Sequence, residues 1–304
     1  MAPGSSLPGP TWEANPAVST LLRWYEPRRS AYPWRGADPY GVWVSEVMLQ
    51  QTQAARVAPA YVAFLHRFPD VRALAAAPLA EVLRAWGSLG YPRRAVAISE
   101  AARRMVRDHD GVVPDDPAVL AGLPGIGPYT AAAIAALGYG RPVAAVDTNV
   151  RRVTARSLLG AEPHRLAGSD LFAAADAWLG AGQPGDVLQA LMDLGRTVCR
   201  PFPRCNECPL SEACRFRRAG GVPERGRRRQ PAYAGSLREV RGAVLRVLRS
   251  GPSGGSSIAA IAATTGFTAE RVTDAVRGLA RDGVVAAGPS ALAGRPRGRV
   301  SLPG

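Results

Sequence analysis

The sequence predicts a mainly α-helical chain with more than one domain. Three observations lead to this prediction: apolar residues recur three or four apart over 41–68, a glycine-containing turn joins two helical segments over 116–137, and three amphipathic segments follow residue 236. The chain has 304 residues, enough for two or three domains, and its 47% hydrophobic content is ordinary for globular protein. We therefore expect it to fold on its own.

The amino-terminal residues 1–12, MAPGSSLPGPTW, are rich in Pro, Gly and Ser, and we expect a disordered tail. No amino-terminal segment combines a basic flank with a long apolar core. The longest purely apolar run, Ala131 to Leu137, is far too short to span a bilayer. We expect a cytoplasmic protein with no membrane partner.

The first helical segment, GVWVSEVMLQQTQAARVAPAYVAFLHRF, is predicted to be a helix with Ser45 near its start, and Glu46 is its only acid. The neighbours Trp43, Val47 and Leu49 would solvate a charge poorly and raise the pKa of Glu46. A carboxyl group held protonated near neutral pH can act as a general acid. The alternative, which this stretch alone favours, is a glutamate in the first helical turn facing water.

The charge of the chain points to a polyanionic partner. The formal net charge is +14 and the pI is near 10.8, which favours nucleic acid first and an acidic membrane surface second. All 38 basic residues are arginines. Because the chain has no lysine, it has no lysine amine that could form a Schiff base.

All four cysteines lie in CRPFPRCNECPLSEAC with the spacing C-x5-C-x2-C-x5-C, at Cys199, Cys205, Cys208 and Cys214. Such density in an intracellular chain favours a metal site over disulfides or free thiols. The spacing does not identify the metal, since four thiolates suit zinc and an iron–sulfur cluster alike. Five arginines surround the loop and could bind phosphate: Arg200, Arg204, Arg215, Arg217 and Arg218.

The segment DDPAVLAGLPGIGPYTAAAIAAL predicts a helix–hairpin–helix. A short helix starts near Asp116, a tight turn covers Leu123 to Gly127, and a second helix starts near Pro128. The two glycines before that helix would let backbone N–H groups approach a phosphate. Such a turn is common in helical proteins, so the basic charge and the arginine-rich cysteine loop strengthen the interpretation.

Asp147, in RPVAAVDTNVRRV, follows a short apolar run and precedes a predicted helix. This is an N-cap position, where backbone N–H bonds would keep the carboxylate ionised. Capping alone would explain the residue. Together with Glu46, however, Asp147 would complete the pair that glycosidic bond cleavage requires, one acid for the leaving group and one anion facing the sugar.

These motifs together resemble a known family. SEVMLQQTQ, LGYPRRA, LPGIGPYTA, VDTNVRRV, LQALMDLGRTVC and the cysteine loop occur in the order and approximate spacing of the MutY adenine DNA glycosylases, within the endonuclease III helix–hairpin–helix superfamily. The resemblance covers roughly residues 17–218, and SEVMLQQTQ is particularly MutY-like. It implies an iron–sulfur lobe over 13–30 and 148–218 and a six-helix barrel with the helix–hairpin–helix over 31–147.

The resemblance implies the chemistry of the site. Glu46 would protonate the flipped adenine at N7, Asp147 would stabilise or transiently bond the anomeric carbon, and Asn149 would hold water and the carboxylates in place. Tyr129 stands where lyase members of the superfamily carry lysine, so we expect a monofunctional glycosylase that leaves an abasic site. The cysteines would bind a 4Fe-4S cluster with a structural and DNA-binding role.

The remaining site residues also follow from the resemblance. Those resembling the wall of the adenine pocket are Trp34, Arg35, Leu49 and Gln189. Gln51 and Tyr91 would wedge into the duplex, with Leu89 in the same loop, and Gly125 and Gly127 would bind phosphates. The expected partner is double-stranded DNA containing A:8-oxoguanine or A:G mispairs, bound by a nucleoid-associated monomer.

The chain departs from the family pattern in two places. The family's usual first cysteine gap is six residues, whereas Cys199 and Cys205 enclose five. The family's usual carboxy-terminal domain, which resembles a nucleotide-pyrophosphatase fold and helps recognise 8-oxoguanine, has no counterpart. An arginine-rich linker, 219–235, instead leads to a module over 236–304, as in short MutY proteins of high-G+C bacteria.

The module is predicted to hold three helices, SLREVRGAVLRVLRSG, SSIAAIAATTG and TAERVTDAVRGLARDG, followed by a two-stranded wing from VVAAG and GRVSL. This resembles a winged helix whose third helix would enter a DNA groove. A protein-contact or purely structural role fits the sequence equally well.

Two other functions stay open for the whole chain. One is another base-excision activity, such as removal of thymine from T:G mismatches, because Tyr129 also resembles that branch. The other is a non-catalytic iron–sulfur DNA-binding or redox-sensing protein. Gln51 and Gln189 favour adenine, and the presence of Glu46 and Asp147 favours catalysis.

Overall fold

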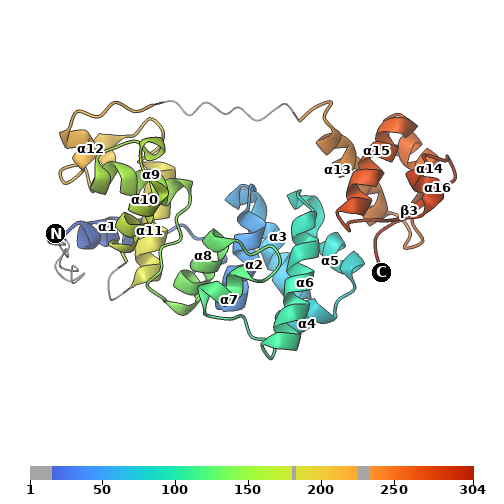
Figure 1. Ribbon diagram of the computed structural model, residues 1–304, viewed down its shortest axis with the longest axis horizontal. Coiled ribbons are helices and arrows are strands. Elements are labelled where there is room, and N and C mark those ends of the chain that lie inside the picture. Colours follow the sequence, from blue (N-terminus) through green and yellow to red (C-terminus); the bar gives the residue numbers. More distant parts are fainter. Residues whose placement is uncertain (1–15, 180–182, 225–232) are drawn as a thin grey trace, which may run out of the picture. The chain divides into compact units, whose positions relative to one another are not determined.

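The computed structural model describes residues 16–179, 183–224 and 233–304, so the expected tail over 1–12 and part of the expected linker lie outside the described residues. The described chain is mainly helical, as predicted (Figure 1). It divides into two compact units, one of 1–43, 115–121 and 126–227 and one of 44–114, 122–125 and 228–304. Each is described by itself.

The first unit is built around the helix α11 (Pro184–Thr197), which packs against α1 (Pro16–Tyr25), α8 (Pro128–Tyr139) and α9 (Thr148–Thr154). Its core includes the fully buried Leu21, Trp178 and Leu191. The unit also contains α7 (Pro117–Ala121), a π-helical turn η4 (Ala155–Leu159), α10 (Gly168–Asp176), α12 (Arg215–Arg218) and the 3-10 turns η2 (Glu26–Arg28), η5 (Pro163–Arg165) and η6 (Cys205–Glu207).

The second unit contains α3 (Ala54–Arg67), α4 (Val71–Ala76), α5 (Leu79–Trp86), the 3-10 turn η3 (Gly87–Leu89) and α6 (Arg93–Asp108). The aromatic rings of Phe64, Phe68 and Trp86 pack edge to face in its core, with centroids 4.9 and 6.1 Å apart. The long helix α6 packs along α4 and α5. The residues of α2 (Pro39–Leu49) are shared between the two units.

The predicted helix around Ser45 is corrected in one respect. The helix α2 begins at Pro39, so Ser45 lies in its interior. The helix ends at Leu49, and the non-helical residues 50–53 separate it from α3, which begins at Ala54. The break contains Gln51 with a φ of 57°, a left-handed conformation that cannot continue a helix. The hydrophobic period runs through both helices, which is why it did not mark the break.

The carboxy-terminal module holds the three predicted helices, α13 (Leu237–Ser250), α14 (Ile258–Thr265) and α15 (Ala269–Arg281) (Figure 1). The expected wing pairs β2 (Ala286–Ala287) with β3 (Arg299–Ser301), with a short α16 (Pro289–Leu292) between them. A strand that was not predicted, β1 (Ser256–Ser257), completes an antiparallel sheet of order β1-β3-β2. The sequence placed Ser256–Ser257 in the second helix, whereas Ser257 is the N-cap of α14 and accepts a hydrogen bond from Ala260 N at 3.2 Å.

The boundaries of the expected lobes stay a prediction. In the division into two units, the helices α7 and α8 group with the cysteine-bearing unit, and α8 packs on α11. The described part of the module groups with the helices α3 to α6. No helix in the described part of the chain has both the length and the apolar character needed to cross a membrane.

Candidate active site and cysteine loop

Glu46 lies in the interior of α2 and is only 7% exposed. Its helical neighbours Trp43, Val47 and Met48 are also buried. The interpretation that Glu46 sits in a first helical turn and faces water is therefore wrong. Glu46 therefore lies among apolar side chains of its own helix.

Asp147 is the N-cap of α9, as predicted. Its Oδ1 accepts hydrogen bonds from Asn149 N at 2.8 Å and Val150 N at 2.6 Å, and its Oδ2 accepts one from Asn149 Nδ2 at 2.9 Å. Burial nevertheless raises the pKa of Asp147, outweighing the lowering by these bonds. Burial sets the direction of the shift, and the hydrogen bonds of the cap oppose it.

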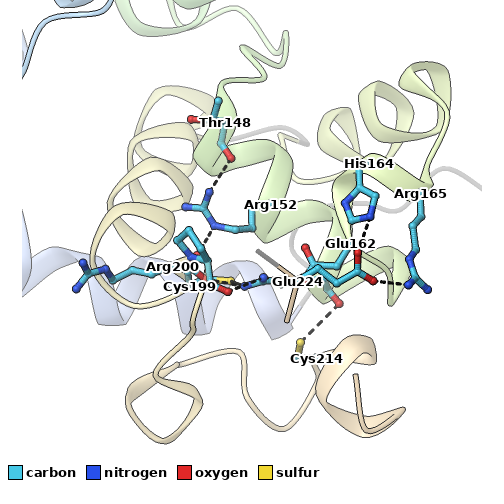
Figure 2. Close-up of polar contacts among 11 residues, drawn as sticks. Thr148, Arg152, Glu162, His164, Arg165, Cys199, Arg200, Cys214 and Glu224 are labelled. Carbon is cyan, nitrogen blue, oxygen red and sulfur yellow. Dashed lines mark hydrogen bonds and ion pairs between the residues drawn. The ribbon is translucent and has the colours of Figure 1, made fainter. Parts of the chain in front are cut away.

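A hydrogen-bonded chain connects Asp147 to the cysteine loop. Asn149 Oδ1 accepts from Arg152 Nη2 at 2.9 Å, and Arg152 Nε donates to the carbonyl of Cys199 at 2.6 Å. Figure 2 shows the Arg152 guanidinium between Thr148 and Cys199. Gly195 permits the close approach, because a Cβ there would lie 2.6 Å from that of Asn149.

Arg152 was not among the predicted site residues. Its only signal in the sequence is its place in VDTNVRRV, three residues after Asn149 on the same helix.

The four cysteines are half-buried and form no disulfides. Arg156, which is 2% exposed, places Nη1 3.9 Å from Cys199 Sγ and donates to the Arg200 carbonyl at 2.7 Å. The Cys214 thiol donates to the Arg156 carbonyl at 3.6 Å (Figure 2). The buried Arg156 also pairs with Glu162 at 2.7 Å.

Burial raises the pKa of the Cys208 thiol to about 11 and also raises that of Cys199. Among the described residues, no three or more His, Cys, Asp and Glu side chains are grouped as ligands of a metal ion. The donor set itself suits a cluster, since four thiols share one loop and two guanidinium groups, those of Arg152 and Arg156, act electrostatically on Cys199.

Three of the four candidate pocket residues lie in the first unit. Trp34 stacks on Tyr32 with ring centroids 4.8 Å apart, and Gln189 Oε1 accepts from the Tyr25 hydroxyl at 2.8 Å. Arg35 Nη2 binds both carboxylate oxygens of Asp193 at 3.2 Å. Leu49, at the end of α2, belongs to the second unit and is half-buried.

Asp193 is a further functional candidate that the sequence did not single out. It is 5% exposed and also accepts from Ser30 Oγ at 3.3 Å and Arg196 Nη2 at 3.2 Å. Its sequence signal is an acid one helical turn after Gln189 in an apolar run of α11.

The helix–hairpin–helix turn has the geometry that the sequence predicted. Gly125 has a φ of 75°, and a Cβ there would lie 2.8 Å from that of Ala97. Gly127 is the exposed residue immediately before α8, whose second residue is the half-buried Tyr129. The backbone of this turn is therefore accessible at a helix amino terminus.

The two candidate wedge residues share a rare conformation. Gln51 and Tyr91 are both exposed and have φ values of 57° and 47°, an uncommon state for residues other than glycine. Leu89, named for the same loop, is instead 3% exposed and belongs to the core. Strained, exposed residues of this kind cluster at functional sites.

Beneath both loops lies Arg94, which was not among the predicted site residues. Its guanidinium is 8% exposed and donates to the carbonyls of Val47, Met48 and Gln50 at 2.7–2.8 Å. It also donates to the carbonyl of Gly90 at 3.1 Å and stacks under the Tyr91 ring at 5.4 Å. One side chain thus holds the Gln51 and Tyr91 segments together.

Comparison with known proteins defines the class. Residues 44–165 match the HhH-GPD superfamily of base excision DNA repair proteins. A thermostable thymine-DNA glycosylase superimposes with a TM-score of 0.62 at 30% identity, covering 66% of this chain and 95% of that chain. An endonuclease III trapped on DNA shares the fold, with a TM-score of 0.57 at 22% identity and coverage of 67% and 95%. The fold is that of a helix–hairpin–helix base excision repair protein.

Curated relatives narrow the class further. The adenine DNA glycosylase of Mycobacterium tuberculosis is 45% identical over 257 residues, covering 82% of both chains. That of Mycolicibacterium smegmatis is 47% identical over 232 residues, covering 75% of this chain and 79% of the relative. The chain belongs to the adenine DNA glycosylase family and is a DNA N-glycosylase of base excision repair, which confirms the resemblance found in its motifs.

Proposed function

We propose that this protein removes adenine paired with 8-oxoguanine or guanine in double-stranded DNA and leaves an abasic site. The observation that carries the proposal is the burial of Glu46 on a helix that ends beside the strained, exposed Gln51. This arrangement places a carboxyl in apolar surroundings next to a segment suited to enter DNA. Family membership supplies adenine as the base.

In the proposed reaction, Glu46 in its protonated form donates a proton to N7 of the extruded adenine. The C1′–N9 bond then breaks with its electron pair leaving on the adenine, and the sugar develops positive charge. The ionised Asp147 stabilises that charge or bonds transiently to C1′. Water then adds to C1′, displacing Asp147 where it has bonded, and the proton of the water passes to the Glu46 carboxylate. Asn149, which donates to Asp147, holds the carboxylate in place.

The pocket and DNA contacts are proposed for the residues that the family resemblance selected. Trp34, Arg35, Leu49 and Gln189 would bind the extruded adenine. Asp193 would act on Arg35 as a positioning residue, since it binds the Arg35 guanidinium. The proposal is supported by the hydrogen bonds that fix Arg35 and Gln189 in one orientation each.

Contacts with the duplex are assigned to exposed backbone and strained side chains. Gln51 and Tyr91 would fill the space left by the extruded base, and Gly125 and Gly127 would bind phosphates. Leu89 would support the wedge from the core, because it is buried. The net charge of +14 supports a polyanionic partner, with the protein acting as a nucleoid-associated monomer.

The cysteines would hold a 4Fe-4S cluster with a structural and DNA-binding role. The donor set fits such a cluster, and when bound it would tie 199–214 into one rigid loop. Around it, Arg152 and Arg156 hold the backbone of Cys199 and Arg200 by hydrogen bonds.

Strand cleavage is not expected to follow base removal. The chain has no lysine, and the Tyr129 phenol cannot form an imine with the sugar aldehyde. We propose a monofunctional glycosylase whose abasic product is cut only by added alkali. Thymine removal from T:G mismatches is a second candidate, which the similarity to a thymine-DNA glycosylase favours.

The test is single-turnover excision on duplexes carrying A opposite 8-oxoguanine, A opposite G, and T opposite G, with and without alkali. Selective loss of A, with cleavage after alkali only, is the expected result. Loss of T would favour the second candidate, and cleavage without alkali would contradict the monofunctional assignment. Tight binding without excision would favour a non-catalytic DNA-binding protein.

The role of Glu46 is tested by Glu46→Gln, which should lower the excision rate about 10²- to 10⁴-fold while sparing duplex binding. Glu100→Gln is the matched control, since the Glu100 carboxylate is exposed and makes only an (i, i+4) pair with Arg104. An unchanged rate for Glu46→Gln would overturn the assigned mechanism.

A further inference from the structure

Within the second unit, the carboxy-terminal module contacts the turn that leads into Tyr91. Arg249, near the end of α13, donates from Nη1 to the carbonyl of Gly87. Gly87 has a φ of 54°, ends α5 and begins η3, three residues before the exposed Gly90–Tyr91 pair. Arg249 is half-buried, and desolvation by burial lowers its pKa.

A second contact lies on the other side of the same loop. Asp282, at the end of α15, accepts from Arg241 of α13 and lies 3.7 Å from Arg93 Nε, the first residue of α6. The module therefore contacts the chain immediately before and immediately after 88–92. We call 87–93 the wedge loop.

The amino-terminal half of α15 exposes acids, which do not suit a DNA groove. Its first two turns expose the acids Glu270 and Asp274, which would repel phosphates. The exposed Arg277 is bound to Asp274 at 3.2 Å and to the Leu292 carbonyl at 2.8 Å. Helices that read DNA instead present cations and amides on the exposed face.

We propose that the partner of the carboxy-terminal module is the wedge loop of the same chain, and that Arg249 is a positioning residue that fixes this loop for DNA. The proposal rests on the proposed role of Tyr91 as a wedge. Because the Gly87 carbonyl is held from the module, the turn that presents Tyr91 is already ordered before DNA binds. Ordering a loop in advance lowers the entropy that binding must overcome.

The test compares dissociation constants for two duplexes of one sequence, undamaged and carrying a tetrahydrofuran abasic analogue, by fluorescence anisotropy. A wedge acts only where a nucleotide is missing from the stack, so the ratio of the two constants reports its positioning. We expect Arg249→Met to lower the preference for the abasic duplex about fivefold, in the range of residue couplings within a protein. Arg249→Lys, which can still donate to Gly87, should recover part of the preference.

The matched control is Arg246→Met, because Arg246 is an exposed arginine of the same helix. It should leave the preference unchanged. Tyr91→Ala should lower the preference at least as much as Arg249→Met. If Arg249→Met does not fold, Asp282→Asn takes its place in the comparison. This substitution weakens the contact with Arg93 while preserving the side-chain volume, and it should also lower the preference for the abasic duplex.

The outcomes separate this proposal from the wedge assignment. An unchanged preference in Tyr91→Ala would overturn both. A loss in Tyr91→Ala but not in Arg249→Met would keep the wedge and overturn the positioning role. An equal loss of affinity for both duplexes in Arg249→Met, with a smaller salt dependence, would overturn the proposal and make Arg249 a direct phosphate contact.

Discussion

Arg94→Met should be among the most destabilising single substitutions in the second unit. Methionine fills nearly the same volume but donates no hydrogen bonds. It would leave the carbonyls of Val47, Met48 and Gln50, now 2.7–2.8 Å from the guanidinium, without their donor. The first two belong to the last turn of α2, where helix carbonyls lack intrahelical partners and a cation is favoured.

The magnitude follows from the number and burial of these contacts. A hydrogen bond to a charged group contributes about 1.5–3 kcal/mol, and the contributions of one side chain do not add fully. The substitution also removes the cost of burying a charge, so the free energy of unfolding should fall by about 3–5 kcal/mol in total. At about 2–4 °C for each kcal/mol, the unfolding midpoint of the second unit should fall by roughly 10 °C.

The assay is thermal unfolding followed by circular dichroism and by calorimetry, which resolves separate transitions. Arg103→Met is the control, since Arg103 lies on the same helix but is exposed and makes only long bonds of 3.4 and 3.5 Å to carbonyls. It should shift the midpoint by less than about 2 °C. If Arg94→Met and the control shift it equally, the assignment of Arg94 as the link between the two loops is refuted.

Three further predictions concern the first unit. Arg152→Met should slow single-turnover excision about tenfold, because Asn149 loses the guanidinium that orients its amide, whereas an unchanged rate would show that the Asp147 cap suffices. Burial raises the pKa of Asp147 above its ordinary 3.8. The contribution of Asp147 to the free energy of unfolding is therefore fully present below pH 3.8, where the carboxyl is protonated in both states. This contribution is lost as the pH rises through the pKa of the folded state. Asp147→Asn should therefore melt higher than the unsubstituted protein near pH 7, with the gain vanishing toward about pH 3 in a pH series of melts, and a pH-independent difference would contradict the raised pKa. Arg156→Met should cost about 3–5 kcal/mol in chemical denaturation because it leaves Glu162 buried and unpaired, and Arg156→Met combined with Glu162→Gln should recover part of that loss.

The elements that could be predicted from the sequence are those whose conformation depends on residues close to one another in the chain. The helix–hairpin–helix turn follows from Gly125, which needs a positive φ, and from Pro128, which suits a first helical position. The cap at Asp147 follows from a carboxylate just before a helix. The three helices of the module follow from their apolar stripes, since the buried Val240, Val244 and Leu248 lie on one face of α13.

Other features were wrong or missing because they depend on distant parts of the chain. The break after Leu49 interrupts no hydrophobic period, and β1 is only two residues long and exists by pairing with β3. Whether Glu46 faced water could not be decided locally, because its exposure depends on what packs around α2.

The sequence by itself determined the helical hairpin, the cap, the cysteine loop and the family, because each rests on residue types at short, fixed spacings. Only the tertiary structure decided which polar side chains are buried and what they bind. Arg94 is a link between two loops because backbone carbonyls more than forty residues away in the sequence converge on it. Asp193 and Arg249 owe their roles to partners still more remote in the sequence, Arg35 and Gly87. The sequence shows only that a guanidinium or carboxylate is present. Its role is determined by the groups that folding brings within hydrogen-bonding distance.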